Sequence, residues 1–272
     1  MKNSFKISFI AIICAVLCSC NGYDKLLKST DYDKKYTEAK RYYDEGKYRQ
    51  AKDLFENLVV NDRKKERAEE IAWLYGQSLL KCKDYYTAAY QFKTFTRRYP
   101  YSNNIEEASF LAAYCRYVES PEYTLDQAIT RDAITELENF ADIYPQSIHM
   151  PEVNNCLDEL RDKLMMKDYE IAVGYYTIES YNAAVVSLNN FLVNYPDSPK
   201  REEAMYYIIK AGYRYAINSR EEKIKERLQQ VVNNFDKFAT TFKDSKHLSE
   251  CQTIYTKSKA LLAEMETKEG KK

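Results

Sequence analysis

The sequence predicts an all-α fold, a solenoid of about five helix pairs that is closed by a capping helix at the C-terminus. A short motif, Phe-x-x-x-Tyr-Pro-x-Ser, recurs along the chain, and its successive prolines are 45 and 51 positions apart. Glycine and proline occupy only six positions each among 272 residues, too few for the many tight turns of a β-sandwich or barrel. A fixed period in a composition that permits helices is typical of stacked helical repeats.

Residues 1–19 are predicted to be a signal peptide that is not part of the fold. Lys2 and Lys6 supply a positive start, an apolar run follows that is too short to span a bilayer, and Leu17-Cys18-Ser19 then precedes Cys20. This order resembles the bacterial lipobox, which implies cleavage before Cys20 and an N-acyl diglyceride, with palmitate as the acyl chain, on that residue. More than one acyl chain anchors a protein stably. The alternative is an ordinary signal peptide with coincidental cysteines.

The segment between this anchor and the first helix pair, residues 20–30, is expected to be a short lipid-anchored tether. If its ten residues after Cys20 were extended, they would reach at most ~35 Å, at ~3.5 Å per residue.

Each copy of the motif is expected to end a helix, because proline cannot continue a helix and pushes the preceding residue out of the α region. Complete copies occupy residues 95–102, 140–147 and 191–198. In a degenerate fourth copy, residues 238–245, Phe242 and Lys243 replace Tyr-Pro, which leaves the end of the last pair open.

Small residues recur at fixed distances before the motif. Gly76 and Ala88 lie 24 and 12 residues before Pro100, and the same spacing recurs before Pro196. Small residues on two adjacent helices let their backbones approach closely. The pattern resembles the tetratricopeptide repeat, which implies antiparallel helix pairs. The predicted pairs start near Asp31, Glu69, Glu106, Met165 and Ala204.

The third and fifth pairs each contain eight extra residues, which are expected to lengthen either the loop between their helices or the second helix. A last helical segment, residues 246–266, is expected to cap the fifth pair.

The first helices of the pairs are expected to line a concave surface. Placing the repeat frame on these helices directs a mainly aromatic set of side chains inward, which we call the predicted groove. Rigid amphipathic rings favour binding of an extended or helical peptide that carries aromatic side chains. For any single ring, packing between helices is an equally open alternative. The predicted groove consists of Tyr36, Tyr43, Trp73, Gln77, Lys81, Phe110, Tyr114 and Tyr117.

No catalytic, metal or nucleotide site is predicted. The only histidines, His149 and His247, lie near predicted turns without a Cys, Ser or carboxylate partner at motif spacing, so a capping or solvated role is expected. The 41 basic and 41 acidic side chains give no basic excess, so nucleic acid is not an expected partner.

Four cysteines of the mature chain lie singly in segments with helical periodicity. No two have C-x-x-C spacing, so neither a zinc site nor a redox pair is predicted. They are interpreted as small buried apolar side chains, and whether any two pair stays open. They are Cys82, Cys115, Cys156 and Cys251.

The expanded third pair reads Tyr117-Val-Glu-Ser120-Pro121 and then Leu125-Asp126-Gln127-Ala128. Together with the lipobox and the Tyr-Pro-x-Ser turns, it makes essentially the whole mature chain resemble the BamD, or YfiO-type, family of outer-membrane lipoproteins. The resemblance implies a non-enzymatic subunit, without a cofactor, of the BAM machine that inserts β-barrel proteins. It also implies a location on the periplasmic face of the outer membrane.

The resemblance further implies a division of labour. Repeats 1–3, residues 31–147, would bind unfolded barrel precursors in the predicted groove. Repeats 4–5 with the capping helix, residues 150–267, would dock on the POTRA domains of a BamA-like barrel subunit, and Arg214 in Ala211-Gly-Tyr-Arg is similar to a segment used for that docking.

Two other functions remain open from the sequence. One is a tetratricopeptide lipoprotein scaffold for cell-wall or polysaccharide-uptake machinery. The other is a lipid-anchored glycan hydrolase, which would need two carboxylates ~5 to 10 Å apart in a pocket.

Overall fold

The computed structural model describes residues 22–62 and 65–269, so the predicted signal peptide and the predicted lipidation site, Cys20, lie outside the described residues. Within these ranges all regular structure is helical, which confirms the all-α prediction. The chain divides into two compact units. The first unit comprises the described residues up to Pro121 together with Asp126–Leu160, and the second comprises Glu122–Leu125 and the described residues from Arg161 onward.

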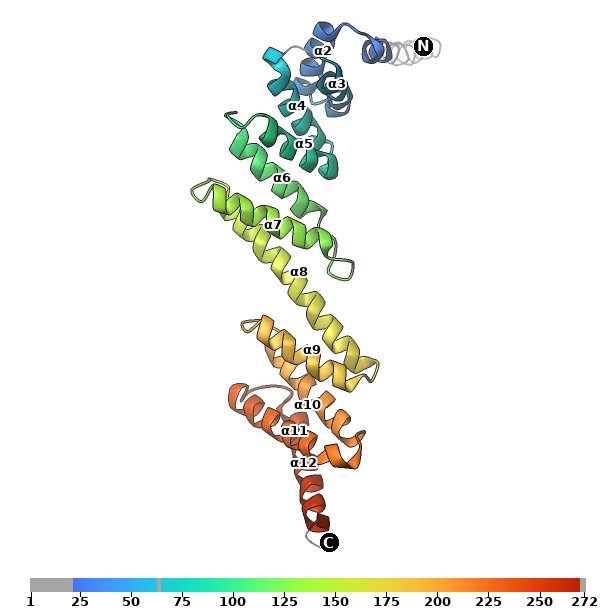
Figure 1. Cartoon of the computed structure of the whole chain (residues 1–272), viewed down its shortest axis with the longest axis vertical. Coiled ribbons are helices and arrows are strands. Elements are labelled where there is room, and N and C mark those ends of the chain that lie inside the picture. Colours follow the sequence, from blue (N-terminus) through green and yellow to red (C-terminus); the bar gives the residue numbers. More distant parts are fainter. Residues whose placement is uncertain (1–21, 63–64, 270–272) are drawn as a thin grey trace, which may run out of the picture. The chain divides into compact units, whose positions relative to one another are not determined.

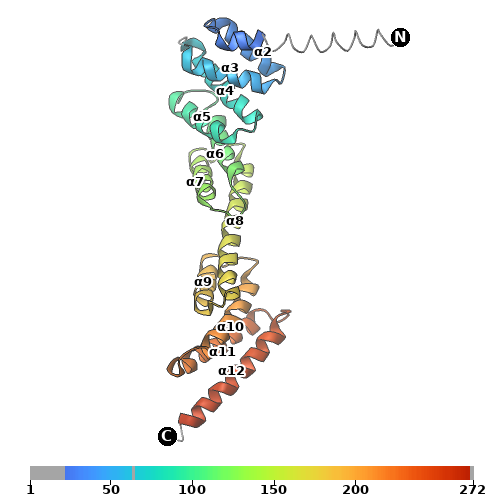
Figure 2. The same cartoon turned by 90° about the vertical axis from the view of Figure 1, so that its right-hand side faces the viewer.

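In the first unit, each helix packs on the next one along the chain (Figure 1, Figure 2). The predicted pairs correspond to α2 with α3, α4 with α5, and α6 with α7. The helices are α2 (Tyr32–Asp44), α3 (Tyr48–Asn61), the short 3₁₀ helix η1 (Lys65–Arg67), α4 (Ala68–Lys81), α5 (Tyr85–Arg98), α6 (Ile105–Glu119) and α7 (Ala128–Ile143).

In the second unit, α10 packs on α9 and on α11, and α12 packs on both α10 and α11. The predicted capping helix is therefore present as α12. The helices that follow α8 (Met150–Thr177) are α9 (Tyr181–Asn194), α10 (Arg201–Ile217), α11 (Glu221–Thr241) and α12 (Leu248–Glu269).

The 28-residue helix α8 has no break near the predicted start of the fourth pair at Met165. The division between the units falls inside it, after Leu160, rather than between residues 147 and 150. Val153 and Leu160 belong to the core of the first unit, whereas Tyr169 and Ala172 belong to a core of the second. Apolar residues at helical spacing thus continue through the whole segment, and nothing in it ends the helix.

The extra residues of the two expanded pairs lie in different elements: a loop in the third pair and a helix in the fifth. In the third pair they form the loop between α6 and α7, since α7 starts only at Ala128. In the fifth pair they lengthen the second helix, because α11 has 21 residues whereas α9 has 14.

All four motif copies have the same structure. The motif phenylalanine is at most 3% exposed, and its carbonyl accepts the N–H of the residue at the Tyr position at 2.8 or 2.9 Å. The rings at these two positions lie 5.1 to 5.4 Å apart. Phe242 has φ −121° and ψ 65°, close to Tyr99 at −127° and 63°. Phe242-Lys243 therefore ends a helix as Tyr-Pro does, because the contact between the buried phenylalanine and the second, half-buried ring is retained.

The motif serine closes each turn. In every copy its Oγ accepts the N–H of the residue two positions later, at 3.0 or 3.1 Å. Ser102 Oγ also donates to Glu69 Oε1, and Ser245 Oγ to Glu202 Oε1, both at 2.6 Å. These bonds tie the end of a helix pair to the first turn of the helix that opened it.

Ser102→Ala is expected to lower the free energy of unfolding by about 1–2 kcal/mol, because Ser102 is buried and its hydroxyl serves two partners. Urea denaturation measures the change. Ser109→Ala is the control, since the Ser109 hydroxyl donates only to the Ile105 carbonyl within α6, and this change should stay within about 0.5 kcal/mol. Equal effects of the two substitutions would contradict the role assigned to the motif serine.

The two histidines do not have the capping or solvated role expected from the sequence. Each ring follows a motif serine by two residues and stacks on an aromatic side chain, His149 on Phe110 and His247 on Tyr206, with ring centroids 4.0 Å apart in both cases. His149 Nε2 also lies 2.7 Å from Glu107 Oε2. Both side chains therefore pack the turn against the preceding first helix.

The four cysteines in the described residues are all free, which answers the question of pairing that the sequence left open. Cys115, Cys156 and Cys251 are buried, as expected, whereas Cys82 is only half-buried. Burial raises the pKa of the Cys156 thiol to about 11 and those of Cys115 and Cys251 to about 12. The neutral thiol is the favoured form because a buried thiolate would lose its hydration.

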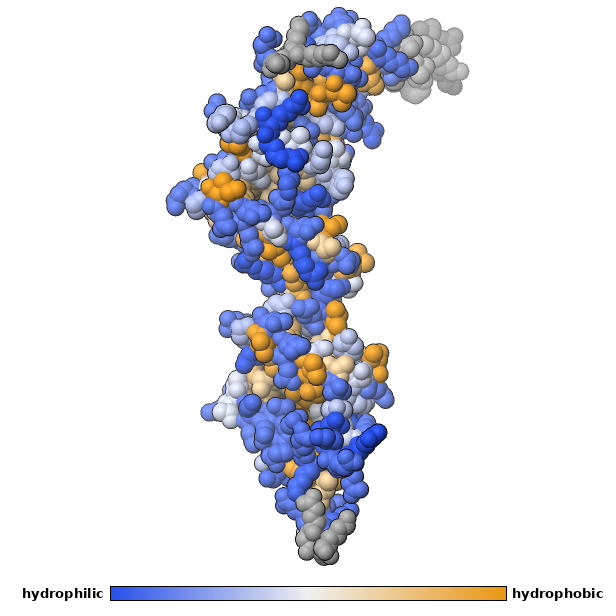
Figure 3. Space-filling model, in the orientation of Figure 1, coloured by the Kyte–Doolittle hydropathy of each residue, from blue (hydrophilic) through white to orange (hydrophobic). Residues whose placement is uncertain are grey.

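Residues 22–28 form a short helix that is folded onto α2 and α3 rather than extended as a tether. No helix among the described residues is long and apolar enough to cross a membrane. On the face shown in Figure 3, most residues are hydrophilic and the apolar ones lie in small separate groups.

Candidate functional site

The predicted groove residues lie on α2, α4 and α6, which are the first helices of the three pairs in the first unit. Six of the eight side chains are half-buried, and Lys81 at the end of α4 is exposed. The exception is Phe110, which is only 4% exposed.

Phe110 is a core residue, so its ring is not available to line the predicted groove. Its ring stacks on His149 and lies 5.8 Å from Phe140 and 5.7 Å from Tyr114. Trp73 is anchored in a similar way, with its ring 5.7 Å from Phe92 and 5.6 Å from the motif phenylalanine of α5. For these two residues, the alternative of packing between helices describes the structure better than exposure to a ligand.

Tyr114 and Tyr117 continue from Phe110 along α6, and their rings are 5.7 Å apart. The Tyr117 hydroxyl donates to Glu159 of α8. This hydrogen bond, together with burial, raises the pKa of Tyr117, so the phenol keeps its proton and the ring keeps its orientation.

A Tyr-Lys-Glu cluster joins α2 to α4. The Tyr36 hydroxyl donates to Glu70, and Lys40 Nζ lies 2.6 Å from the other oxygen of that carboxylate. The guanidinium of Arg67 lies over the Tyr36 ring, 4.7 Å from its centroid. Hydrogen bonds from Lys40 and Tyr36 hold the pKa of Glu70 below its usual range. The α2 side of the predicted groove is therefore polar and held in one geometry.

The same cluster recurs in the second unit between α10 and α12. The Tyr206 hydroxyl donates to Glu250 at 2.7 Å, and Lys210 Nζ lies 3.0 Å from the same carboxylate. Sequence reasoning missed both clusters. The signal that could have revealed them is Tyr-x-x-x-Lys on one first helix and glutamate at the third position of the next.

Arg214, the predicted docking residue, lines a hollow of about 470 Å³ on the second unit. Arg214 is exposed, as is Lys257 on α12, whereas Glu250 is already engaged by Tyr206 and Lys210. Three cations and one carboxylate give the wall a positive balance, and tyrosine rings supply apolar area. The lining residues are Tyr176, Lys210, Tyr213, Arg214, Ile217, Glu250, Thr253, Ile254 and Lys257.

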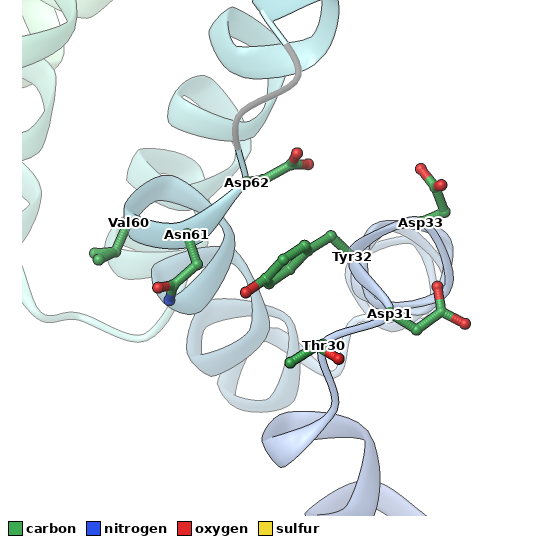
Figure 4. A pocket seen from close by; sticks show the side chains of 7 residues that line it. All are labelled: Thr30, Asp31, Tyr32, Asp33, Val60, Asn61 and Asp62. Atoms are coloured by element: carbon green, nitrogen blue, oxygen red, sulfur yellow. The ribbon is translucent and has the colours of Figure 1, made fainter.

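A second hollow, of about 620 Å³, lies between the start of α2 and the end of α3 in the first unit (Figure 4). Tyr32 reaches across it toward Asn61, while Asp31 and Asp33 point away from that ring. Arg67 forms ion pairs with Asp33 at 2.8 Å and with Asp62 at 2.5 Å. The carboxylates beside this hollow thus hold Arg67, the last residue of η1, in place.

Within the ranges that the structure describes, no group of three His, Cys, Asp or Glu side chains could hold a metal ion. The described surfaces offer aromatic rings, amides and charges, which are groups that bind a peptide or protein by contact.

Comparison with known proteins identifies relatives over most of the chain. A relative from Aquifex aeolicus, named as a BamD outer membrane protein assembly factor, is 25% identical over 216 residues, which are 75% of this chain and 70% of the relative. Outer membrane protein assembly factor BamD of Caulobacter vibrioides is 19% identical over 211 residues, 76% of this chain and 69% of that protein. The factor of the same name from Helicobacter pylori is 28% identical over 78 residues, covering 29% and 36% of the two chains.

The family model of YfiO, described as an outer membrane lipoprotein, matches residues 29–228 and 170–270. These segments include all four motif turns and the expanded third pair. The match confirms the family that those residues predicted: this chain belongs to the YfiO family of outer membrane lipoproteins.

Proposed function

We propose that this chain is a lipid-anchored, non-enzymatic subunit of the machine that assembles β-barrel proteins into the outer membrane. The observation that carries the proposal is the family match together with relatives named as outer membrane protein assembly factors. Acylation at Cys20 would hold the chain on the periplasmic face of that membrane.

The first unit would bind unfolded barrel precursors through the polar and aromatic side chains of α2, α4 and α6. The hydroxyls of Tyr36 and Tyr117 are held by Glu70 and Glu159, so these rings are oriented before a client arrives. Binding then costs less side-chain entropy. An unfolded strand that ends in an aromatic residue offers both rings and backbone groups to such a surface.

The second unit would dock on the POTRA domains of a BamA-like barrel subunit through the hollow around Arg214. Its positive balance and tyrosine walls suit a segment that carries a carboxylate beside apolar area.

Affinity purification of the detergent-extracted protein tests the assignment. A co-purifying β-barrel subunit with POTRA domains supports it. Recovery of cell-wall enzymes or polysaccharide transporters in its place would favour a scaffold for those machines and overturn the proposal.

Arg214→Glu is expected to lower the yield of the co-purified barrel subunit several-fold, because it reverses the charge at the hollow while leaving the core intact. Quantitative mass spectrometry of the purified complex measures the yield. Arg220→Glu is the matched control, since Arg220 is also exposed but lies in the loop before α11, outside that hollow. Equal yields for the two variants would contradict docking at Arg214.

A further inference from the structure

Residues 22–30 connect the proposed lipid anchor to the first helix pair. We infer that this segment is a rigid stem, locked by Lys35, that holds the α2–α3 pair against the lipid surface in which the anchor sits. The membrane part of this inference depends on the proposed acylation of Cys20, and the lock itself does not.

Lys35 of α2 is 1% exposed, although lysine is rarely buried without a partner. Its ammonium group has three N–H donors, and all three are used. Nζ donates to the Leu27 carbonyl at 3.0 Å, to the Ser29 carbonyl at 2.8 Å and to Asn57 Oδ1 at 2.5 Å. Two of these acceptors belong to the stem and the third belongs to α3, so one side chain joins the stem, α2 and α3.

The corner between the stem and α2 is also closed by local bonds. The Ser29 N–H donates to the Leu26 carbonyl, and Ser29 Oγ accepts the N–H of Asp31, both at 3.0 Å. Asp31 in turn caps α2 by accepting the N–H of Lys34. The direction of the stem is therefore coupled to the start of α2.

Apolar contacts hold the other end of the stem. Leu26 is 8% exposed and belongs to the core of the first unit. The Tyr23 ring lies edge-on to Tyr42 of α2 at 5.9 Å, and its hydroxyl donates to Asp53 of α3 at 3.1 Å. An isolated helix shorter than about 12 residues is unstable in water, so the helix at 22–28 exists because it is docked.

Docking shortens the connection to the membrane. Cys20 precedes Gly22 by two residues, so at most ~7 Å of extended chain separates an acylated cysteine from the docked helix. If residues 21–30 were free and extended, the first helix pair could lie up to ~35 Å from the acylated cysteine. The part of the α2–α3 pair nearest Tyr23 must then lie next to the lipid headgroups. A short stiff connection also raises the effective concentration of the first unit toward a partner embedded in the same membrane.

The test uses the lipidated full chain, extracted from membranes and reconstituted into phosphatidylethanolamine–phosphatidylglycerol vesicles. Hydrogen–deuterium exchange reports on the stem amides. Energy transfer from Trp73, the only tryptophan, to a dansyl-labelled headgroup lipid reports the distance between the first unit and the membrane. Lys35→Met removes the lock, and Lys34→Met is the matched control because that neighbouring side chain is exposed.

In the wild-type protein and in Lys34→Met, the amides of 26–29 should be protected, because these are the stem amides with a backbone acceptor in the short helix, and energy transfer should be equal. In Lys35→Met, those amides should exchange about tenfold faster and energy transfer should fall, while exchange in α4 to α7 stays unchanged. The double variant Tyr23→Ala with Leu26→Ala removes contacts of the stem itself and should also give faster exchange of those amides and lower energy transfer. It therefore tests the docked stem even if Lys35→Met unfolds the α2–α3 pair.

Unprotected stem amides in the wild-type protein would overturn the inference. The inference would also be overturned if both Lys35→Met and the double variant showed the same amide exchange and energy transfer as the wild-type protein. Protein that fails to float with the vesicles would count against acylation of Cys20, and hence against the membrane contact. The exchange comparison in solution would still decide whether Lys35 locks the stem, so the two failures are distinguishable.

Discussion

Gly76→Leu is expected to lower the free energy of unfolding of the first unit by about 3 kcal/mol, in the upper range for overpacking a helix interface. A Cβ atom at Gly76 would lie 2.7 Å from Cε1 of Phe92, well inside van der Waals contact. Phe92 is fully buried, so its ring has no free space into which it could move. Denaturation followed by the fluorescence of Trp73, whose ring lies 5.7 Å from Phe92, measures the change.

Gly174→Leu is the control in α8, in the second unit, because nothing lies within 4 Å of a Cβ atom at that position. There the substitution should stabilise by up to about 1 kcal/mol, since leucine has a much higher helix propensity than glycine. Far-UV circular dichroism follows the denaturation of this variant, since Trp73 lies in the first unit. If Gly76→Leu were as stable as Gly174→Leu, close approach of α4 and α5 would not be the reason for glycine at position 76.

The double variant Gln77→Ala with Lys81→Glu is expected to weaken binding of a peptide copied from the terminal strand of a barrel protein about tenfold, or about 1.4 kcal/mol. Gln77 and Lys81 are four residues apart and share one face of α4. Their loss removes an amide that can bond to a strand backbone and reverses a charge that suits the terminal carboxylate. Fluorescence anisotropy of a labelled peptide measures the affinity, and circular dichroism checks that helix content is native.

Arg97→Glu on α5 is the control for the charge change, because Arg97 is exposed on a second helix, away from the predicted groove. It should leave peptide affinity unchanged. Unaltered affinity of the α4 double variant, with native helix content, would remove the groove proposal without affecting membership of the family.

Gln77 and Lys81 are better probes of the predicted groove than Trp73, because the stability of the core does not depend on their side chains. Truncating Trp73 would remove its contacts with Phe92 and Phe95 and destabilise the first unit, so lost binding could not be separated from lost folding. The sequence cannot separate Trp73 from Gln77 and Lys81, because the repeat frame directs all three to the same face of α4. Only the structure shows that Trp73 packs in the core.

The sequence alone was sufficient for the fold class, the helix ends at the three complete Tyr-Pro turns and the family. A buried phenylalanine, the ring four residues later and the serine that closes the turn act within about eight residues, so a local pattern captures their geometry. Even the degenerate copy at Phe242 obeys it, because the aromatic ring rather than the proline retains the packing.

The tertiary structure alone decided which rings are covered, where along α8 the division between the units falls and whether residues 22–30 are extended or docked. Phe110 is buried because His149, 39 residues later, stacks on it, whereas Tyr36 stays half-buried, with its hydroxyl bonded to Glu70. Nothing in the sequence distinguishes Lys35 from the other lysines of α2. The structure shows that its ammonium group donates to the carbonyls of Leu27 and Ser29. Helical periodicity assigns a side chain to a face, but burial depends on which distant residue packs against that face, and that information is not local.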